Sequence, residues 1–262
     1  MEQQPFVRGQ GLLVLRRHTT VAPSPRVLRL EPGRLLIMPL QADPEREALA
    51  RAWQAAGGKV QRLARIWAPE PASAEQSVAV YGNAIFCQVL ADALNLQLLG
   101  PEDDLLARLP RPLTGRAVTV SRLAQAAHLN YPCFVSSLPP KLFTSGIVGS
   151  APRLASLTEG LSRKTGLLVS EVVHFEAEAR AFIYDRKVLD LSVYRGKGER
   201  DEAMALAETV AALEGTPFGY TVDLGLVSGA WTVMKFHPSW EARLRGCDPA
   251  KVIFSIAAAT RA

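Results

Sequence analysis

The chain has 262 residues, of which 48% are hydrophobic and 21% are charged, and its formal net charge at pH 7 is +5. This length predicts one large domain or a few small lobes, and the apolar content excludes a disordered chain or a fibre. Residues 1–34 hold six Arg against two Glu, so the rest of the chain is almost neutral. A nucleic-acid surface spread over the whole protein is therefore not expected.

The cysteines and the apolar runs bound the compartment. Cys87, Cys133 and Cys247 are far apart and form no Cys-x-x-Cys pair, so neither a disulfide framework nor a zinc knuckle is predicted. No apolar run approaches the roughly 20 residues that a membrane helix needs. The start of the chain does not resemble a secretory signal, because Glu2 is acidic and the apolar stretch ends at Arg16. We expect a cytoplasmic protein without a membrane segment.

The first half of the chain predicts an N-terminal arm followed by βαβ units. Two short apolar runs within residues 1–34 favour an arm or an edge hairpin. From residue 35 onward, short apolar runs alternate with helical patterns. Asp43-Pro44 is typical of a helix start, and Gly57-Gly58 of its end. The expected strands are 35–38, 60–66 and 78–81, with a second helix over 83–95.

The second half predicts mainly antiparallel structure. A strand is expected at 133–135, then a mobile loop over 136–150, and a capping box at Ser156-x-x-Glu159 predicts a helix from there to about 165. Alternating segments surround a turn at 185–187, and Ser228-Gly229 is typical of a hairpin. Further helices are expected over 201–214 and from Asp248-Pro249 to the end. The sequence thus predicts α+β lobes with a site in the crevice between them.

Four stretches, in order, resemble the ATP-grasp superfamily, and within it a small bacterial and phage clade of predicted amide-bond ligases related to the ribosomal-protein glutamate ligases. The resemblance covers about residues 35–262. The matching stretches are Val80-Tyr-Gly-Asn83 with Leu98 to Asp104; Phe134-Val-Ser-Ser137 with Lys141-Leu-Phe143; Val169-Ser-Glu-Val-Val173 with Glu178-Ala-Arg180; and Val222-Asp-Leu-Gly225 with Trp231 to Trp240 and Gly246-Cys-Asp-Pro249.

The resemblance implies a division of the chain and a reaction. It implies an α/β pre-grasp lobe over 35–115, two ATP-grasp lobes with mixed or antiparallel sheets over 116–262, and residues 1–34 as a basic extension. An active member would phosphorylate a small-molecule or peptide carboxylate with ATP and would let an amine attack the acyl phosphate. Magnesium ions and cationic side chains would balance the phosphate charge.

The resemblance also implies roles for particular side chains. Lys141 and Arg180 fall where phosphates would be bound during catalysis, Glu171 falls at the hinge that contacts the nucleotide, and Asp223 falls at the first metal ligand. Glu178 belongs to the same strand face as Arg180, because the two residues are two apart. Each residue has a plain structural alternative: a solvated loop lysine for Lys141, a cross-strand ion pair for Glu178 and Arg180, and a turn carboxylate for Asp223.

Three positions depart from the family pattern. Ser136 replaces the strand lysine, and Lys235 and His237 replace the Glu and Asn that bind metal in the hairpin. A protonated lysine offers no lone pair to Mg²⁺, and imidazole is a poor ligand for a hard cation, so we expect the magnesium site to be degenerate. Lys235 is a candidate to pair with Asp223 in place of the metal. His237 with Asp223 could alternatively hold a zinc-like ion, or His237 is simply a hydrogen-bonded strand residue.

Three functions stay open at this point. The first is an ATP-dependent carboxylate-amine ligase, with ATP and Mg²⁺ as the cofactors that the resemblance implies. The second is a degenerate, ligase-like pseudoenzyme that binds a ligand or a protein partner, and a homo-oligomer is compatible with either. The third is a nucleic-acid-associated protein that uses the Arg-rich arm, a role that the near-neutral body disfavours.

Overall fold

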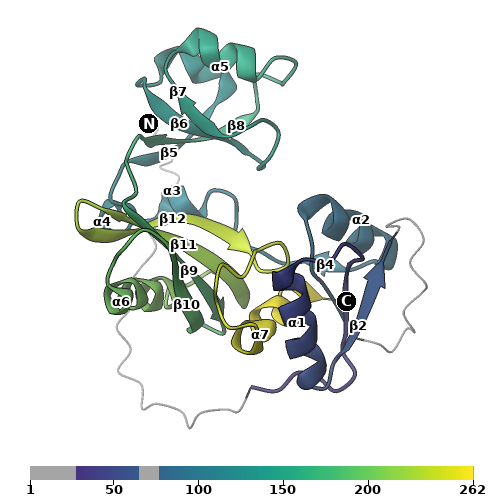
Figure 1. Cartoon of the computed structure of the whole chain (residues 1–262). Helices are drawn as coiled ribbons and strands as arrows, with labels where there is room; N and C mark the ends of the chain where they lie inside the picture. Colours follow the sequence, from purple (N-terminus) through teal and green to yellow (C-terminus); the bar gives the residue numbers. More distant parts are fainter. Residues whose placement is uncertain (1–27, 65–76, 262) are drawn as a thin grey trace, which may run out of the picture.

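The computed structural model describes residues 28–64 and 77–261, so the hairpin considered for residues 1–34 lies almost entirely outside the described residues. The described strands form three larger sheets and one two-stranded pair (Figure 1). We call the three larger ones the parallel sheet, the small sheet and the large sheet. Within the described ranges, no helix is long and apolar enough to cross a membrane.

The parallel sheet has the strand order β2-β1-β3, and all of its pairs are parallel. Its strands are β1 (Leu35–Pro39), β2 (Lys59–Leu63) and β3 (Val78–Val80), and its helices are α1 (Pro44–Ala55) and α2 (Ala84–Leu94). Asp43 caps α1 and Asn83 caps α2, each by accepting a backbone hydrogen bond. The predicted βαβ unit is therefore confirmed.

The end of the chain returns to this first region. A connecting segment contains β4 (Gln97–Leu98), α3 (Leu105–Arg108) and α4 (Arg111–Thr114), and β4 pairs with the last strand, β13 (Thr260–Arg261). Helix α7 (Pro249–Ala258) packs against α1 and β1 on one side and against the large sheet on the other. One buried cluster thereby joins the parallel sheet to the large sheet.

The small sheet has the order β5-β8-β6-β7 and is antiparallel throughout. Its elements are β5 (Val118–Arg122), the 3-10 helix η1 (Leu123–His128), β6 (Cys133–Leu138), β7 (Gly146–Val148), α5 (Ala151–Leu157) and β8 (Gly166–Glu171). The helix expected over 156–165 is wrong. Ser150 caps α5 instead, so the helix ends where the predicted one begins, and Gly160 turns the chain with φ +80°.

The large sheet has the order β10-β9-β11-β12. Its strands are β9 (Ala177–Tyr184), β10 (Lys187–Arg195), β11 (Gly219–Val227) and β12 (Ala230–Pro238), and α6 (Arg200–Ala211) follows β10. Odd-numbered residues of β9 are apolar and pack toward α6, whereas Glu178 and Arg180 point to the opposite face. The hairpin predicted at Ser228-Gly229 joins β11 to β12 and is confirmed.

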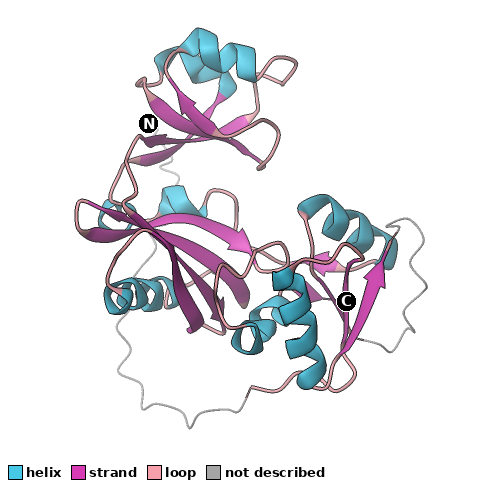
Figure 2. Cartoon of the chain, viewed as in Figure 1, coloured by secondary structure: helices cyan, strands magenta, loops and turns pink. Residues whose placement is uncertain are grey.

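Figure 2 shows how the layers are arranged: α6 lies along the large sheet, α5 caps the small sheet, and α1 and α7 lie between the large sheet and the parallel sheet. The faces of the small and large sheets that are not covered by α5 and α6 supply the residues of the crevice. The three cysteines are buried and free.

Candidate functional site in the crevice between the sheets

Two cavities occupy the crevice, and both are lined by residues of the small sheet and of β12. The larger one has a volume of about 290 Å³ and is mainly apolar, with Phe134 and Ile147 from the small sheet on one wall and Met234 on the other. The smaller one, of about 120 Å³, is lined by polar residues that include Ser136, Lys141 and His237. Lys235 lines both, so it marks the junction between an apolar and a polar compartment.

The apolar cavity depends on a close approach between a loop and β11. Phe175 follows β8 and packs against Gly225, where a Cβ atom would collide with the aromatic ring. The guanidinium of Arg116 lies 5.4 Å from the centre of the Phe175 ring and donates hydrogen bonds to the carbonyl oxygens of Val233 and Met234. The glycine of the Val222-Asp-Leu-Gly225 stretch is thus required by packing beside the cavity.

Glu171 ends β8 at the edge of the apolar cavity. Its carboxylate accepts a hydrogen bond from the backbone N–H of Ala117 at 2.8 Å and forms an ion pair with Arg111 at 3.1 Å. The structure therefore places Glu171 where the segment leading into the small sheet meets the segment leaving it. Contact with a nucleotide stays a prediction for this residue.

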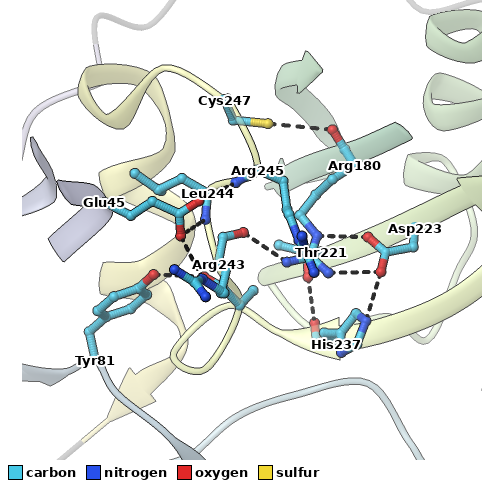
Figure 3. Close-up of polar contacts among 11 residues, drawn as sticks. Glu45, Tyr81, Arg180, Thr221, Asp223, His237, Arg243, Leu244, Arg245 and Cys247 are labelled. Atoms are coloured by element: carbon cyan, nitrogen blue, oxygen red, sulfur yellow. Dashed lines mark hydrogen bonds and ion pairs between the residues drawn. The ribbon is translucent and has the colours of Figure 1, made fainter. Parts of the chain in front are cut away.

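The opposite end of the crevice holds a buried charge cluster formed by Arg180, Asp223 and His237, which we call the Asp223 cluster (Figure 3). Asp223 pairs with Arg180 in the register of β11 and β9, and both residues are only 5% exposed. The Nε and one terminal nitrogen of Arg180 each donate to a different Asp223 oxygen at 2.7 Å. The other terminal nitrogen of Arg180 donates to the carbonyl oxygen of Arg243.

His237 completes the cluster. Its Nε2 lies 2.9 Å from Asp223 Oδ2, the same oxygen that one arm of Arg180 contacts. Burial by itself would raise the pKa of the Asp223 carboxyl, but the hydrogen bonds from His237 and Arg180 outweigh burial and hold this pKa well below its usual range. Asp223 is therefore an ionised carboxylate whose charge is balanced inside the protein.

The expected ion pair between Lys235 and Asp223 is not formed. The two residues face each other in the strand register, but Arg180 and His237 are the partners of Asp223. Within residues 28–64 and 77–261, nothing forms a hydrogen bond or ion pair with the exposed Lys235 ammonium. The reason is geometric: Arg180 meets both carboxylate oxygens from the neighbouring strand β9, which leaves Lys235 directed toward the two cavities.

The other predicted site residues also have partners. Lys141 lies in the loop between β6 and β7 and forms a 2.5 Å ion pair with Glu241, which follows β12. Glu178 pairs with Arg195 across β9 and β10 rather than with Arg180. Arg180 is directed at Asp223, so its role at a phosphate stays a prediction. The structure brings Lys141, Lys235 and His237 together around the polar cavity, whereas Glu171 lies at the apolar one.

These residues do not fit a pair of magnesium ions. Mg²⁺ binds hard oxygen ligands in near-octahedral geometry, and Asp223 has both oxygens occupied by Arg180 and His237. Among the described residues, no group of three or more His, Cys, Asp or Glu side chains could hold a metal ion. The same finding leaves the alternative zinc-like site at Asp223 and His237 without a third ligand.

Several residues of the crevice were missed by the sequence analysis. Phe134, Ile147 and Phe175 line the apolar cavity, and Arg116 supports it from behind. The alternation of buried and exposed positions in β6 could have indicated Phe134, which is 39% exposed between buried neighbours. Glu241 had no sequence signal, because its partner Lys141 lies 100 residues away.

A family model describes more than half of the chain. This model, an ATP-grasp domain of clade family 2, matches residues 113–254, which contain the small sheet, the large sheet and both cavities. The chain belongs to the ATP-grasp superfamily. The resemblance inferred from the four sequence stretches and the α+β fold class are thereby confirmed. A comparison with curated proteins finds no match to this ATP-grasp protein.

Solved structures agree on the fold. A RimK domain ATP-grasp protein from Sphaerobacter thermophilus is 19% identical, with a TM-score of 0.56, and the match covers 86% of this chain and 98% of that one. N5-carboxyaminoimidazole synthetase from Staphylococcus aureus is 11% identical, with a TM-score of 0.56 and coverages of 89% and 80%. The synthase of the same name from Aspergillus clavatus, solved with ADP and its ribonucleotide, is 12% identical, with a TM-score of 0.54 and coverages of 86% and 77%. The ATP-grasp protein described here shares their fold.

Proposed function

We propose that this ATP-grasp protein binds ATP in the crevice, with the base in the apolar cavity and the phosphates in the polar cavity. The observation that supports this proposal is the meeting of the two cavities at Lys235. A flat apolar base fits between Phe134 and Ile147 on one wall and Met234 on the other. The ammonium of Lys235 has no partner among the described residues at the junction, where a phosphate chain would begin.

The charge balance of the polar cavity favours an anion beside Lys235. The negative charge of Glu241 is paired with Lys141, and Glu102 is paired with Arg108. Asp103 also lines this cavity, and burial raises the pKa of its carboxyl, as does the neighbouring Asp104 to a lesser extent. In this protein, Lys235 and the loop residue Lys141 would balance phosphate charge in place of two magnesium ions.

The reaction class that family membership favours is carboxylate-amine ligation. The terminal phosphate of ATP would be transferred to a carboxylate of a small molecule or peptide, which gives ADP and an acyl phosphate. An amine would then displace the phosphate and form an amide, while its proton is released. This assignment makes the protein an ATP-dependent ligase whose phosphate site differs from the two-magnesium arrangement.

A second candidate is a protein that binds ATP or a partner without turning ATP over. The Asp223 cluster favours it, because the hairpin carboxylate is held by two internal cationic or hydrogen-bonding groups. Such a site binds a nucleotide through fixed side-chain charges and lacks the movable positive charge that assists transfer. The two candidates share ATP binding and differ in ADP formation.

Thermal unfolding with ATP tests the shared part, since a ligand that binds only the folded state raises the unfolding midpoint. We expect millimolar ATP to raise the midpoint in EDTA as well as in Mg²⁺. The shift should be lost in Lys235→Ala and kept in Lys187→Ala, which removes an exposed lysine at the start of β10. ATP binding is refuted if no shift occurs in either condition. Formation of ADP with added carboxylates and amines then supports the ligase, and its absence supports the second candidate.

A further inference from the structure

A third cavity, of about 190 Å³, lies at the carboxyl ends of β1 and β3, and we call it the strand-end cavity. Its lining includes Asp43, Arg46, Tyr81, Asn83, Glu241 and Arg243. Strand β1 continues through α1 to β2 on one side, whereas β3 lies on its other side. Open parallel sheets bind ligands outside such strand ends, where the strand order reverses. The volume is smaller than that of drug-sized sites and suits a molecule of about the size of an amino acid.

Most carboxylates of this cavity are already satisfied by its own walls. Asp43 accepts the backbone N–H of Arg46 at the start of α1. Glu45 accepts three hydrogen bonds, from Arg243 Nε and from the backbone N–H groups of Leu244 and Arg245 (Figure 3). Neither carboxylate is therefore available to a ligand.

Arg243 is different, because only its Nε is used. Glu45 fixes the Nε at 3.0 Å, and no described residue accepts a hydrogen bond from the two terminal nitrogens of Arg243. The side chain is 63% exposed and lines the cavity. Glu45 thus holds a guanidinium with free donors at the cavity wall, which is an arrangement that suits a ligand carboxylate.

Glu241 lines both the strand-end cavity and the polar cavity. Its side chain is 16% exposed, and its partner is Lys141 on the loop between β6 and β7. Lys141 belongs to the small sheet and is 58% exposed, so this ion pair spans the crevice instead of belonging to one wall. Glu241 is therefore the lining carboxylate whose partner can leave without disturbing a capped helix or a buried pair.

We propose that the strand-end cavity binds a small zwitterion, with its carboxylate on Arg243 and its ammonium on Glu241, and that Lys141 exchanges between Glu241 and the phosphates of a bound nucleotide. Without nucleotide, Lys141 neutralises Glu241. With phosphates in the polar cavity, Lys141 pairs with them and leaves the Glu241 carboxylate to the ligand ammonium. The exchange rests on the proposed ATP site, whereas the zwitterion site does not.

The exchange makes nucleotide and zwitterion binding cooperative. Each ligand would strengthen the other by the same factor, and about tenfold is typical of such coupling. The orientation also has a chemical meaning, because Glu241 is the lining residue shared with the polar cavity. The amine of the bound zwitterion would therefore face the compartment in which an acyl phosphate would form.

The test compares unfolding midpoints of four proteins with the proteinogenic L-amino acids as probes: wild type, Lys141→Ala, Glu241→Gln, and Glu208→Gln as a matched control on the exposed side of α6. Acetate and methylamine serve as half-ligand probes. Wild type is measured with and without a non-hydrolysable ATP analogue. Lys141→Met provides a second variant should the alanine variant have a lowered midpoint without ligand.

We expect at least one amino acid to raise the midpoint of Lys141→Ala without nucleotide, and of wild type only when the analogue is present, with about tenfold tighter binding. Glu208→Gln should behave as wild type, and Glu241→Gln should lose the response. The inference is overturned if no amino acid stabilises Lys141→Ala or Lys141→Met, if Glu241→Gln keeps the response, or if acetate or methylamine alone is as effective. A response in Lys141→Ala with no effect of the analogue on wild type would instead refute the ATP site and leave the zwitterion site standing.

Discussion

The two ends of the crevice solve different physical problems. At the apolar cavity, Phe134, Ile147 and Met234 form walls around a volume of about 290 Å³ that no described side chain fills. At the Asp223 cluster, a bidentate Arg180 and a hydrogen-bonded His237 fill the space around the carboxylate. One end is therefore preorganised for a ligand, and the other is internally satisfied.

This difference shows that a shared fold can keep the recognition of a base while changing the treatment of charge. A flat apolar cavity needs only shape, and many residues supply it. A metal site needs carboxylates without internal partners, and one cationic side chain placed on both oxygens removes that property. The change from Glu to Lys at 235 and from Asn to His at 237 thus acts together with Arg180, not alone.

Removing the carboxylate of Asp223 should have the largest effect. In Asp223→Ala, the guanidinium of Arg180 stays 5% exposed and loses both of its charged acceptors. We expect the free energy of unfolding to fall by about 3–5 kcal/mol, because a buried charge is left unpaired. Urea denaturation measures the change.

Two further variants show whether the cost comes from the unpaired charge. Arg180→Met combined with Asp223→Leu removes both charges and should recover most of the lost stability. Asp92→Ala on the exposed side of α2 should change stability by less than about 0.5 kcal/mol. A loss below about 1 kcal/mol in Asp223→Ala would show that the cluster does not hold Arg180 as the structure indicates.

Acid should weaken the same cluster. Because the folded pKa of Asp223 lies below its unfolded value of about 3.9, its stabilisation is complete above that value and is lost as the pH falls toward the folded pKa. We expect the stability difference between wild type and Asp223→Asn to shrink by about 2 kcal/mol between pH 5 and strongly acidic solution. Parallel pH profiles for the two proteins would contradict this assignment.

Local signals in the sequence predicted the elements well where a cap or a turn marks them. Asp43-Pro44 gave the correct start of α1, and Ser228-Gly229 gave the hairpin of β11 and β12. The helix expected at Ser156 failed because Ser150 offers an equally good cap one turn and a half earlier, and local sequence does not rank two such caps.

The site was less accessible to the sequence, because its contacts are long-range. Asp223 was found as a candidate, but its partner Arg180 lies 43 residues away on another strand. Strand pairing decides that Arg180 faces Asp223 while Lys235, which is nearer in sequence, does not contact it. The ion pair of Lys141 with Glu241 depends in the same way on how the small sheet lies over the crevice.

The apolar end is tested by truncating one wall. Phe134→Ala removes a ring that is 39% exposed to the cavity, so stability should change little. ATP binding should weaken about tenfold, which corresponds to about 1.4 kcal/mol of lost apolar contact. Calorimetric titration measures the affinity, with Ile85→Ala on the exposed surface of α2 as the control. Unchanged affinity would place the base elsewhere.

Restoring the family residues at the other end should bring the two ends of the crevice closer together in behaviour. Lys235→Glu combined with His237→Asn provides two oxygen ligands beside Asp223 and removes one of its two partners. Because Arg180 still holds Asp223, we expect only a partial recovery: Mg²⁺ should strengthen ATP binding about fivefold in the double variant, equivalent to about 1 kcal/mol. Titrations in Mg²⁺ and in EDTA should differ by less than about twofold in wild type. A strong magnesium dependence of wild type would show that Asp223 leaves Arg180 and His237 when ATP arrives, and the internal charge balance would then be a property of the empty crevice only.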